Sequence, residues 1–252
     1  MKNTYLIPLA LLVYLILTIC MMPARFALNF VTLPQDVKLG AVGGTVWRGT
    51  VSTLHIAHHR LEQLTWQVNP LALFTLKLQA DVTLGHSASE LKGKGKIAIT
   101  TAQELSINQF NLDSNLSYLS SLYPLPMGLN ATGQVKLNVA HFVYSQPWCD
   151  TLDGRLVLTN GTVGSMLGQV AVNRGQVSLT CDKGALVAIM KPNSNSLGID
   201  ATATLSGNYQ LTVNGQVVPP ADAPRDFVNL LQFSSRADSQ GAFPIAFSTR
   251  LN

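Results

Sequence analysis

Residues 5–22 read YLIPLALLVYLILTICMM, eighteen positions without a charged side chain, and they separate a short N-terminus from the rest of the chain. As a helix rising 1.5 Å per residue, this stretch would be about 27 Å long, close to the roughly 30 Å of a bilayer's hydrocarbon core. Pro8 falls in the first turn, where a missing N–H costs little. The sequence therefore predicts one transmembrane helix over residues 5–22.

The charges that flank this stretch favour one orientation. Lys2 and the free amino group precede it, and Arg25 is the one nearby charge that follows it. Because positive charge is retained on the cytoplasmic side, residues 1–4 are expected in the cytoplasm. The remaining chain is then expected to form a stalk over residues 23–36 and a periplasmic, β-rich domain over residues 37–252.

Two other readings of the apolar stretch are disfavoured by its C-terminal end. A cleaved signal peptide has a shorter apolar region and a small-x-small cleavage site, which this end does not supply. A lipoprotein signal would need a small residue before Cys20, and Ile19 is bulky and β-branched. Cys20 is therefore interpreted as a small hydrophobic residue in the helix.

The net charge argues against nucleic acid as a partner. The chain has 17 basic and 13 acidic residues, and charged residues make up 12% of it. Nucleic-acid binding requires clustered Lys and Arg. The nearest approach to a cluster is Lys92, Lys94 and Lys96, which alternation places on one face of a strand, and a solvated face or a blunted edge is favoured over a contact with lipid phosphate.

Alternation of apolar and polar residues predicts most of the body to be antiparallel β-sheet. When apolar and polar residues alternate strictly along a strand, one face of the strand packs on the core and the other is exposed to solvent. Segments with this pattern precede Trp148, and further candidate strands between turn residues follow it. The predicted strands are residues 51–58 and 61–68 (a hairpin around His59 and Arg60), 76–84, 94–99, 105–112, 134–139, 152–158, 169–173, 176–181, 186–190, 198–205, 209–217 and 243–251.

Two short helices interrupt the strands. Leucines at three-residue spacing predict one over residues 115–123, and an amphipathic pattern predicts the other over residues 225–233, with Phe227, Leu230 and Leu231 facing inward. Asn69 and Pro70 are expected to cap a helical turn. The fold class is therefore mainly β: an N-terminal transmembrane helix, then a meandering antiparallel sheet, curved or folded over on itself, or two packed sheets.

Residues that could carry chemistry are sparse. Carboxylates do not pair in a motif, and no serine lies in a nucleophile box. His55, His58 and His59 cluster at the predicted hairpin tip, but His58 has the opposite parity and no acidic residue is near, so an exposed tip is favoured over a metal site. We predict no enzymatic activity, no cofactor and no metal.

The cysteines are consistent with an exported body. Cys20 lies in the apolar stretch, which leaves Cys149 and Cys181. In a non-reducing compartment, the simplest interpretation is a disulfide that closes a loop of about 30 residues and contributes roughly 3 kcal/mol in the chain-entropy model.

Three phrases resemble the general secretion pathway protein N family of type II secretion systems. They are Gly-Thr-Val-Trp-Arg-Gly at residues 44–49, Leu-x-x-Leu-x-Trp-x-Val-x-Pro-x-x-Leu at residues 61–73, and Trp-Cys-x-x-Leu-x-Gly at residues 148–154. The resemblance extends from the apolar stretch to the C-terminal strand.

This resemblance implies an accessory, non-catalytic inner-membrane protein with a periplasmic body, which helps export folded exoproteins through the outer membrane. The implied partners are the inner-membrane platform proteins of the machinery and the lipid bilayer. The family has no catalytic residues to carry over, and Trp47, Trp66 and Trp148 are interpreted as structural anchors. The alternative is a periplasmic module that handles lipid or glycolipid in an apolar β-groove.

Overall fold

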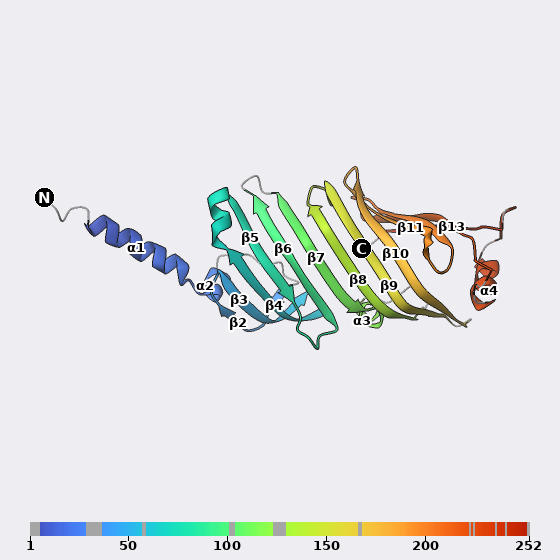
Figure 1. Ribbon diagram of the computed structural model, residues 1–252, viewed down its shortest axis with the longest axis horizontal. Helices are drawn as coiled ribbons and strands as arrows, with labels where there is room; N and C mark the ends of the chain where they lie inside the picture. Colours follow the sequence, from blue (N-terminus) through green and yellow to red (C-terminus); the bar gives the residue numbers. More distant parts are fainter. Residues whose placement is uncertain are drawn as a thin grey trace. The chain divides into compact units, whose positions relative to one another are not determined.

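The computed structural model describes residues 6–28, 37–56, 59–100, 104–122, 130–165, 168–221, 223, 225–234, 236–239 and 241–250. The chain divides into two compact units, Met1–Ser89 (unit 1) and Glu90–Asn252 (unit 2). The described residues form fourteen strands, four α-helices and one 3₁₀ helix (Figure 1). The fold is therefore mainly β, as predicted.

Unit 1 begins with two helices, α1 (Leu6–Cys20) and α2 (Ala24–Leu28). The predicted helix continued to Met22, but α1 ends at Cys20, because Pro23 disfavours helical backbone in the residue before it. Within the described ranges, no helix is both long and apolar enough to cross a membrane. Ala24, in the predicted stalk, is buried, whereas residues 29–36 lie outside the described residues.

The strands of unit 1 form an antiparallel meander. β1 and β2 both pair with β3, β3 pairs with β4, and β4 pairs with β5. The predicted hairpin turn around His59 and Arg60 is wrong, since Ile56 pairs with His59 and His55 with Arg60. His59 and Arg60 therefore belong to a strand, and residues 57–58 lie outside the described residues. The strands are β1 (Val37–Leu39), β2 (Val42–Gly44), β3 (Arg48–Ile56), β4 (His59–Asn69) and β5 (Lys77–Leu84).

A 3₁₀ helix, η1 (Pro70–Thr75), connects β4 to β5 as predicted. Asn69 caps it, because its Oδ1 accepts a hydrogen bond from the Leu71 N–H at 3.0 Å. Pro70 takes the first helical position, where its missing N–H has no partner to lose. The next residue, Leu76, closes the turn in a left-handed conformation with φ of 56°.

The described residues of unit 2 form a single meandering sheet of nine strands rather than two packed sheets. Each strand from β7 on pairs antiparallel with the one before it. Tight turns favour this order: Lys183 and Gly184, both with positive φ, connect β10 to β11. The strands are β6 (Leu91–Thr100), β7 (Leu105–Asn115), β8 (Asn130–Val143), β9 (Thr151–Ser165), β10 (Gly168–Asp182), β11 (Ala185–Asn195), β12 (Ile199–Leu205), β13 (Gln210–Val217) and β14 (Phe243–Arg250).

Two of the predicted strands form one strand in the structure. Residues 169–173 and 176–181 were expected to be separate strands, but both belong to β10. Pairing with β9 carries β10 through the interruption, since Val172 pairs with Gly161 and Arg174 with Thr159. Cross-strand pairing therefore overrides the local turn propensity at Asn173.

The two faces of the unit 2 sheet differ as alternation predicts. Leu137 of β8 lies between Leu112 of β7 and Leu156 of β9, which gives an apolar row across three strands. On the polar face, Lys136 pairs with Asp113 at 3.6 Å. All three leucines of the row are half-buried, so this face is only partly covered.

The buried core of unit 2 forms where a helix covers the sheet. The predicted helices are both present, as α3 (Leu116–Leu122) and α4 (Arg225–Ser234). Phe227 and Leu231 of α4 face inward as predicted, and the Leu230 side chain lies outside the described part. The core residues are Val170, Val172, Leu197, Val217, Phe227, Leu231 and Phe243.

Candidate functional site: two tryptophan junctions

The first junction is built on the Gly-Thr-Val-Trp-Arg-Gly phrase, which forms the tight loop between β2 and β3. Gly44 has φ of 85°, a conformation that side chains other than glycine rarely adopt. The Thr45 N–H donates to the Arg48 carbonyl at 2.8 Å, and Gly44 pairs with Gly49 below the loop. The phrase therefore specifies the loop's shape.

This loop holds the C-terminal end of α1. The Trp47 indole N–H donates to the Ile19 carbonyl at 3.0 Å, and the Val46 N–H donates to the Met22 carbonyl at 3.1 Å. The last carbonyls of a helix have no partner within the helix, so the Trp47 indole satisfies one of these acceptors. Pro23 and Thr45 also form an isolated β-bridge. The helix end is thus joined to the sheet by several hydrogen-bonded contacts.

Trp66 supports the same loop from β4. Its indole N–H donates to the Val46 carbonyl at 3.0 Å. Its ring covers Gly49, the residue paired with it across β3 and β4, and a Cβ added at Gly49 would lie 2.2 Å from Trp66 Cζ2. Glycine at position 49 is therefore required for this packing.

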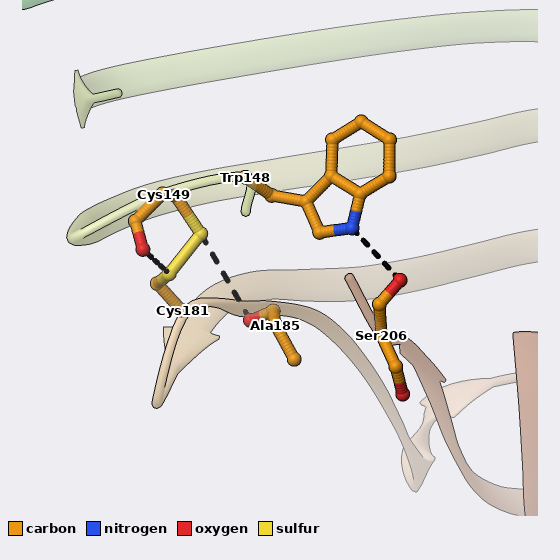
Figure 2. The surroundings of a disulfide bond; sticks show 5 residues. All are labelled: Trp148, Cys149, Cys181, Ala185 and Ser206. Carbon is orange, nitrogen blue, oxygen red and sulfur yellow. Dashed lines mark hydrogen bonds between the residues drawn. A yellow bond between two sulfur atoms is a disulfide. The ribbon is translucent and has the colours of Figure 1, made fainter. Parts of the chain in front are cut away.

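The second junction lies in unit 2, at the Trp-Cys phrase before β9. Cys149 and Cys181 form the predicted disulfide, with their Cα atoms 6.2 Å apart, and Cys149 is fully buried (Figure 2). Two dashed lines end on sulfur atoms. Cys181 Sγ lies 2.9 Å from the Cys149 carbonyl oxygen, and Cys149 Sγ lies 3.9 Å from the Ala185 carbonyl oxygen. Because bonded sulfurs carry no hydrogen, these are contacts and not donated hydrogen bonds.

Trp148 connects the disulfide region to the turn between β12 and β13. Its indole N–H donates to the Ser206 carbonyl at 2.9 Å (Figure 2). Its ring meets Tyr209 edge to face, with centroids 5.0 Å apart and planes at 88°. Residues 58 positions apart in the sequence are thereby held together.

The three tryptophans share one pattern that the sequence did not reveal. Each is half-buried and uses its indole N–H on a backbone carbonyl of a distant segment. A backbone carbonyl has no side-chain signature, so the acceptors at Ile19, Val46 and Ser206 could not be predicted.

A serine, a histidine and a glutamate come together in unit 1 but do not form a catalytic triad. Ser89 Oγ lies 2.6 Å from both Glu62 Oε2 and His86 Nδ1. The hydrogen bonds are satisfied when Ser89 donates to Glu62 and His86 donates to Ser89. A nucleophilic serine would instead donate to the imidazole, with the carboxylate behind it. Glu62 and His86 also line a pocket of about 590 Å³.

Of the three histidines singled out in the sequence, only His55 has a described side chain. His55 lies on β3 opposite Arg60. His58 and the ring of His59 fall outside the described part. Among the described residues, no three His, Cys, Asp or Glu side chains gather in a way that could hold a metal ion.

Comparison with known proteins identifies the family. The sequence model of the family described as "Type II secretion system (T2SS), protein N" matches residues 35–246. The chain belongs to the type II secretion system protein N family. It is similar to the type II secretion system protein N of Aeromonas hydrophila, with 29% identity over the full length of both chains. No solved structure matches it significantly.

Other members of the protein N family match most of the chain. The Vibrio cholerae serotype O1 protein is 23% identical over 88% of both chains, and the Klebsiella pneumoniae protein is 25% identical over 97% of this chain and 95% of its own. The residues matched by the family model include the loop that carries Trp47 and the loop that carries Trp148. The chain is therefore a non-catalytic component of the type II secretion machinery.

Proposed function

We propose that this protein is an accessory scaffold of the secretion machinery at the inner membrane, helping folded exoproteins pass from the periplasm through the outer membrane. The observation that carries the proposal is the Trp47 junction, which joins the apolar α1 to a β-sheet. A connection of this kind lets a membrane helix hold a sheet close to the membrane. The three tryptophans act as structural anchors in this proposal.

The apolar character of α1 supports a membrane location. Its large side chains are exposed on all sides; Ile7, Leu11 and Tyr14 are examples. A helix that is apolar all round is stable only when it is buried in lipid or protein. We propose that residues 5–22 lie in the inner membrane, with residues 1–4 in the cytoplasm, residues 23–36 leading out of it and residues 37–252 in the periplasm.

The proposed partners are the inner-membrane platform proteins of the machinery. Such proteins would be contacted through α1 in the membrane and through the sheet outside it. Co-purification of the tagged full-length chain from native membranes tests this proposal, with the platform proteins expected in the eluate. Recovery of none of them would remove the scaffold role and leave membership of the machinery intact.

A second candidate function rests on the partly covered apolar face of unit 2. The row formed by Leu112, Leu137 and Leu156 is half-buried, and an apolar surface of this kind is stabilised by an apolar ligand. In this alternative, the sheet binds lipid or glycolipid in an apolar groove. Native mass spectrometry of gently purified protein tests it: bound lipid supports the alternative, and its absence counts against it.

A further inference from the structure

Unit 1 displays several large apolar side chains on one turn, and three of them are more than two-thirds exposed. The exposed fractions are 88% for Phe74, 71% for Leu71 and 69% for Leu76. They lie on η1 and the residue that follows it, at the end of the β4–β5 hairpin, where the short helix precedes β5 in Figure 1. We call this group of three side chains, Leu71, Phe74 and Leu76, the apolar tip.

The tip is held in a defined conformation. Asn69 caps the turn, the Thr75 hydroxyl donates to the Ala72 carbonyl at 2.8 Å, and Ala72 itself is buried. The Leu76 N–H donates to the Leu73 carbonyl at 3.0 Å, and Leu76 adopts φ of 56°, which costs a residue other than glycine free energy. Strained backbone of this kind concentrates at functional sites. The display of apolar side chains is thus a stable feature of the hairpin.

The charges around the tip favour a membrane as its partner. Residues 69–80 contain one charged residue, Lys77, which is exposed, and no acidic residue. Apolar side chains next to a basic residue suit the boundary between anionic headgroups and acyl chains. The tip also belongs to the same compact unit as α1, which is apolar on all sides.

We propose that the apolar tip inserts into the headgroup–acyl boundary of the bilayer and gives unit 1 a second membrane contact beside α1. The inference rests on the proposed function, since α1 must bring the unit to the inner membrane. The partner that would cover the apolar tip is the lipid of the periplasmic leaflet. Two points of attachment would fix the sheet's orientation to the membrane, which a single helix end does not.

Spin labelling of the full-length chain in phosphatidylethanolamine–phosphatidylglycerol nanodiscs tests the inference. Cys20→Ser removes the free thiol, and single labels are placed through Phe74→Cys, Leu12→Cys in α1 and Ser87→Cys at an exposed turn. Accessibility to oxygen, which concentrates in lipid, is compared with accessibility to a water-soluble nickel chelate. The label at position 74 is expected to favour oxygen, and the label at position 87 to favour the chelate.

The three labels separate failure of the inference from failure of the proposed anchor. A label at position 74 that favours the chelate while position 12 favours oxygen would overturn the inference and leave the anchor standing. Chelate preference at both positions would overturn the anchor as well. With Leu71→Ser and Leu76→Ser added, the label at position 74 should shift toward the chelate, while position 12 stays unchanged. Persistence of the oxygen preference in that variant would contradict insertion through the tip.

Discussion

Units 1 and 2 are held together in different ways. In unit 1 the buried apolar side chains are small, such as Ala24, Val51 and Ala72, and two indole N–H groups fix the loop between β2 and β3. Unit 2 has a core around α4 and a disulfide. The difference suggests that unit 1 is organised around attachment to α1, whereas unit 2 supplies most of the stability.

The largest predicted effect is in the unit 2 core. Phe227→Ala should lower the free energy of unfolding by about 3–5 kcal/mol, because it removes a buried ring and leaves a cavity. Denaturant unfolding, followed in the full-length protein, measures it. Phe247→Ala is the matched control, since that ring is half exposed in the same unit, and it should cost much less. Equal losses for the two variants would contradict the placement of the core.

The second largest predicted effect is loss of the disulfide. Its 32-residue separation gives about 3–4 kcal/mol of stabilisation in the chain-entropy model, so Cys149→Ser and Cys181→Ser should each lower unit 2 stability by that order. Each variant should also abolish the mobility difference between reduced and unreduced gels. A wild-type protein that shows no such difference would exclude the bridge.

Glycine 49 tests the Trp66 packing in unit 1. Gly49→Ala places a methyl group against the indole ring, which must move or strain, at a cost of about 1–3 kcal/mol. Gly43→Ala is the matched control in the same unit, because a Cβ there would meet only Thr50 Oγ1 at 3.5 Å, an ordinary van der Waals contact. Unchanged tryptophan emission and stability in Gly49→Ala would show that the ring does not cover position 49.

The smallest effect concerns the helix junction. Trp47→Phe removes one hydrogen bond to the Ile19 carbonyl and should cost about 0.5–1.5 kcal/mol. Hydrogen exchange should accelerate for the amides of residues 21–22 and 46, while exchange in unit 2 stays unchanged. Exchange rates at these amides equal to those of the wild type would mean that Trp47 does not secure the helix end.

The sequence predicted features that depend on local chemistry. Asn69 and Pro70 specify a capped turn, and the spacing of Phe227 and Leu231 specifies the inward face of α4; both predictions were confirmed. The hairpin turn predicted around His59 and Arg60 was wrong, because these two residues pair with Ile56 and His55 across the strands. Long-range pairing likewise merged two predicted strands into β10.

The junctions were predicted only in part. The tryptophans and the cysteine pair were recognisable, but the carbonyl acceptors of the indoles depend on tertiary structure. The exposure of Phe74 was also hidden, because an apolar residue beside a strand is ordinarily expected to be buried. Sequence therefore indicated which residues mattered and not what they contact.

The most direct test of the account is the distribution of a known exoprotein after deletion of this chain from its host. An accessory scaffold predicts that the exoprotein accumulates in the periplasm and that the wild-type chain restores its release into the medium. The Trp47→Phe chain should restore release less well. Normal release in the deletion strain would contradict a role in export and direct attention to bound lipid.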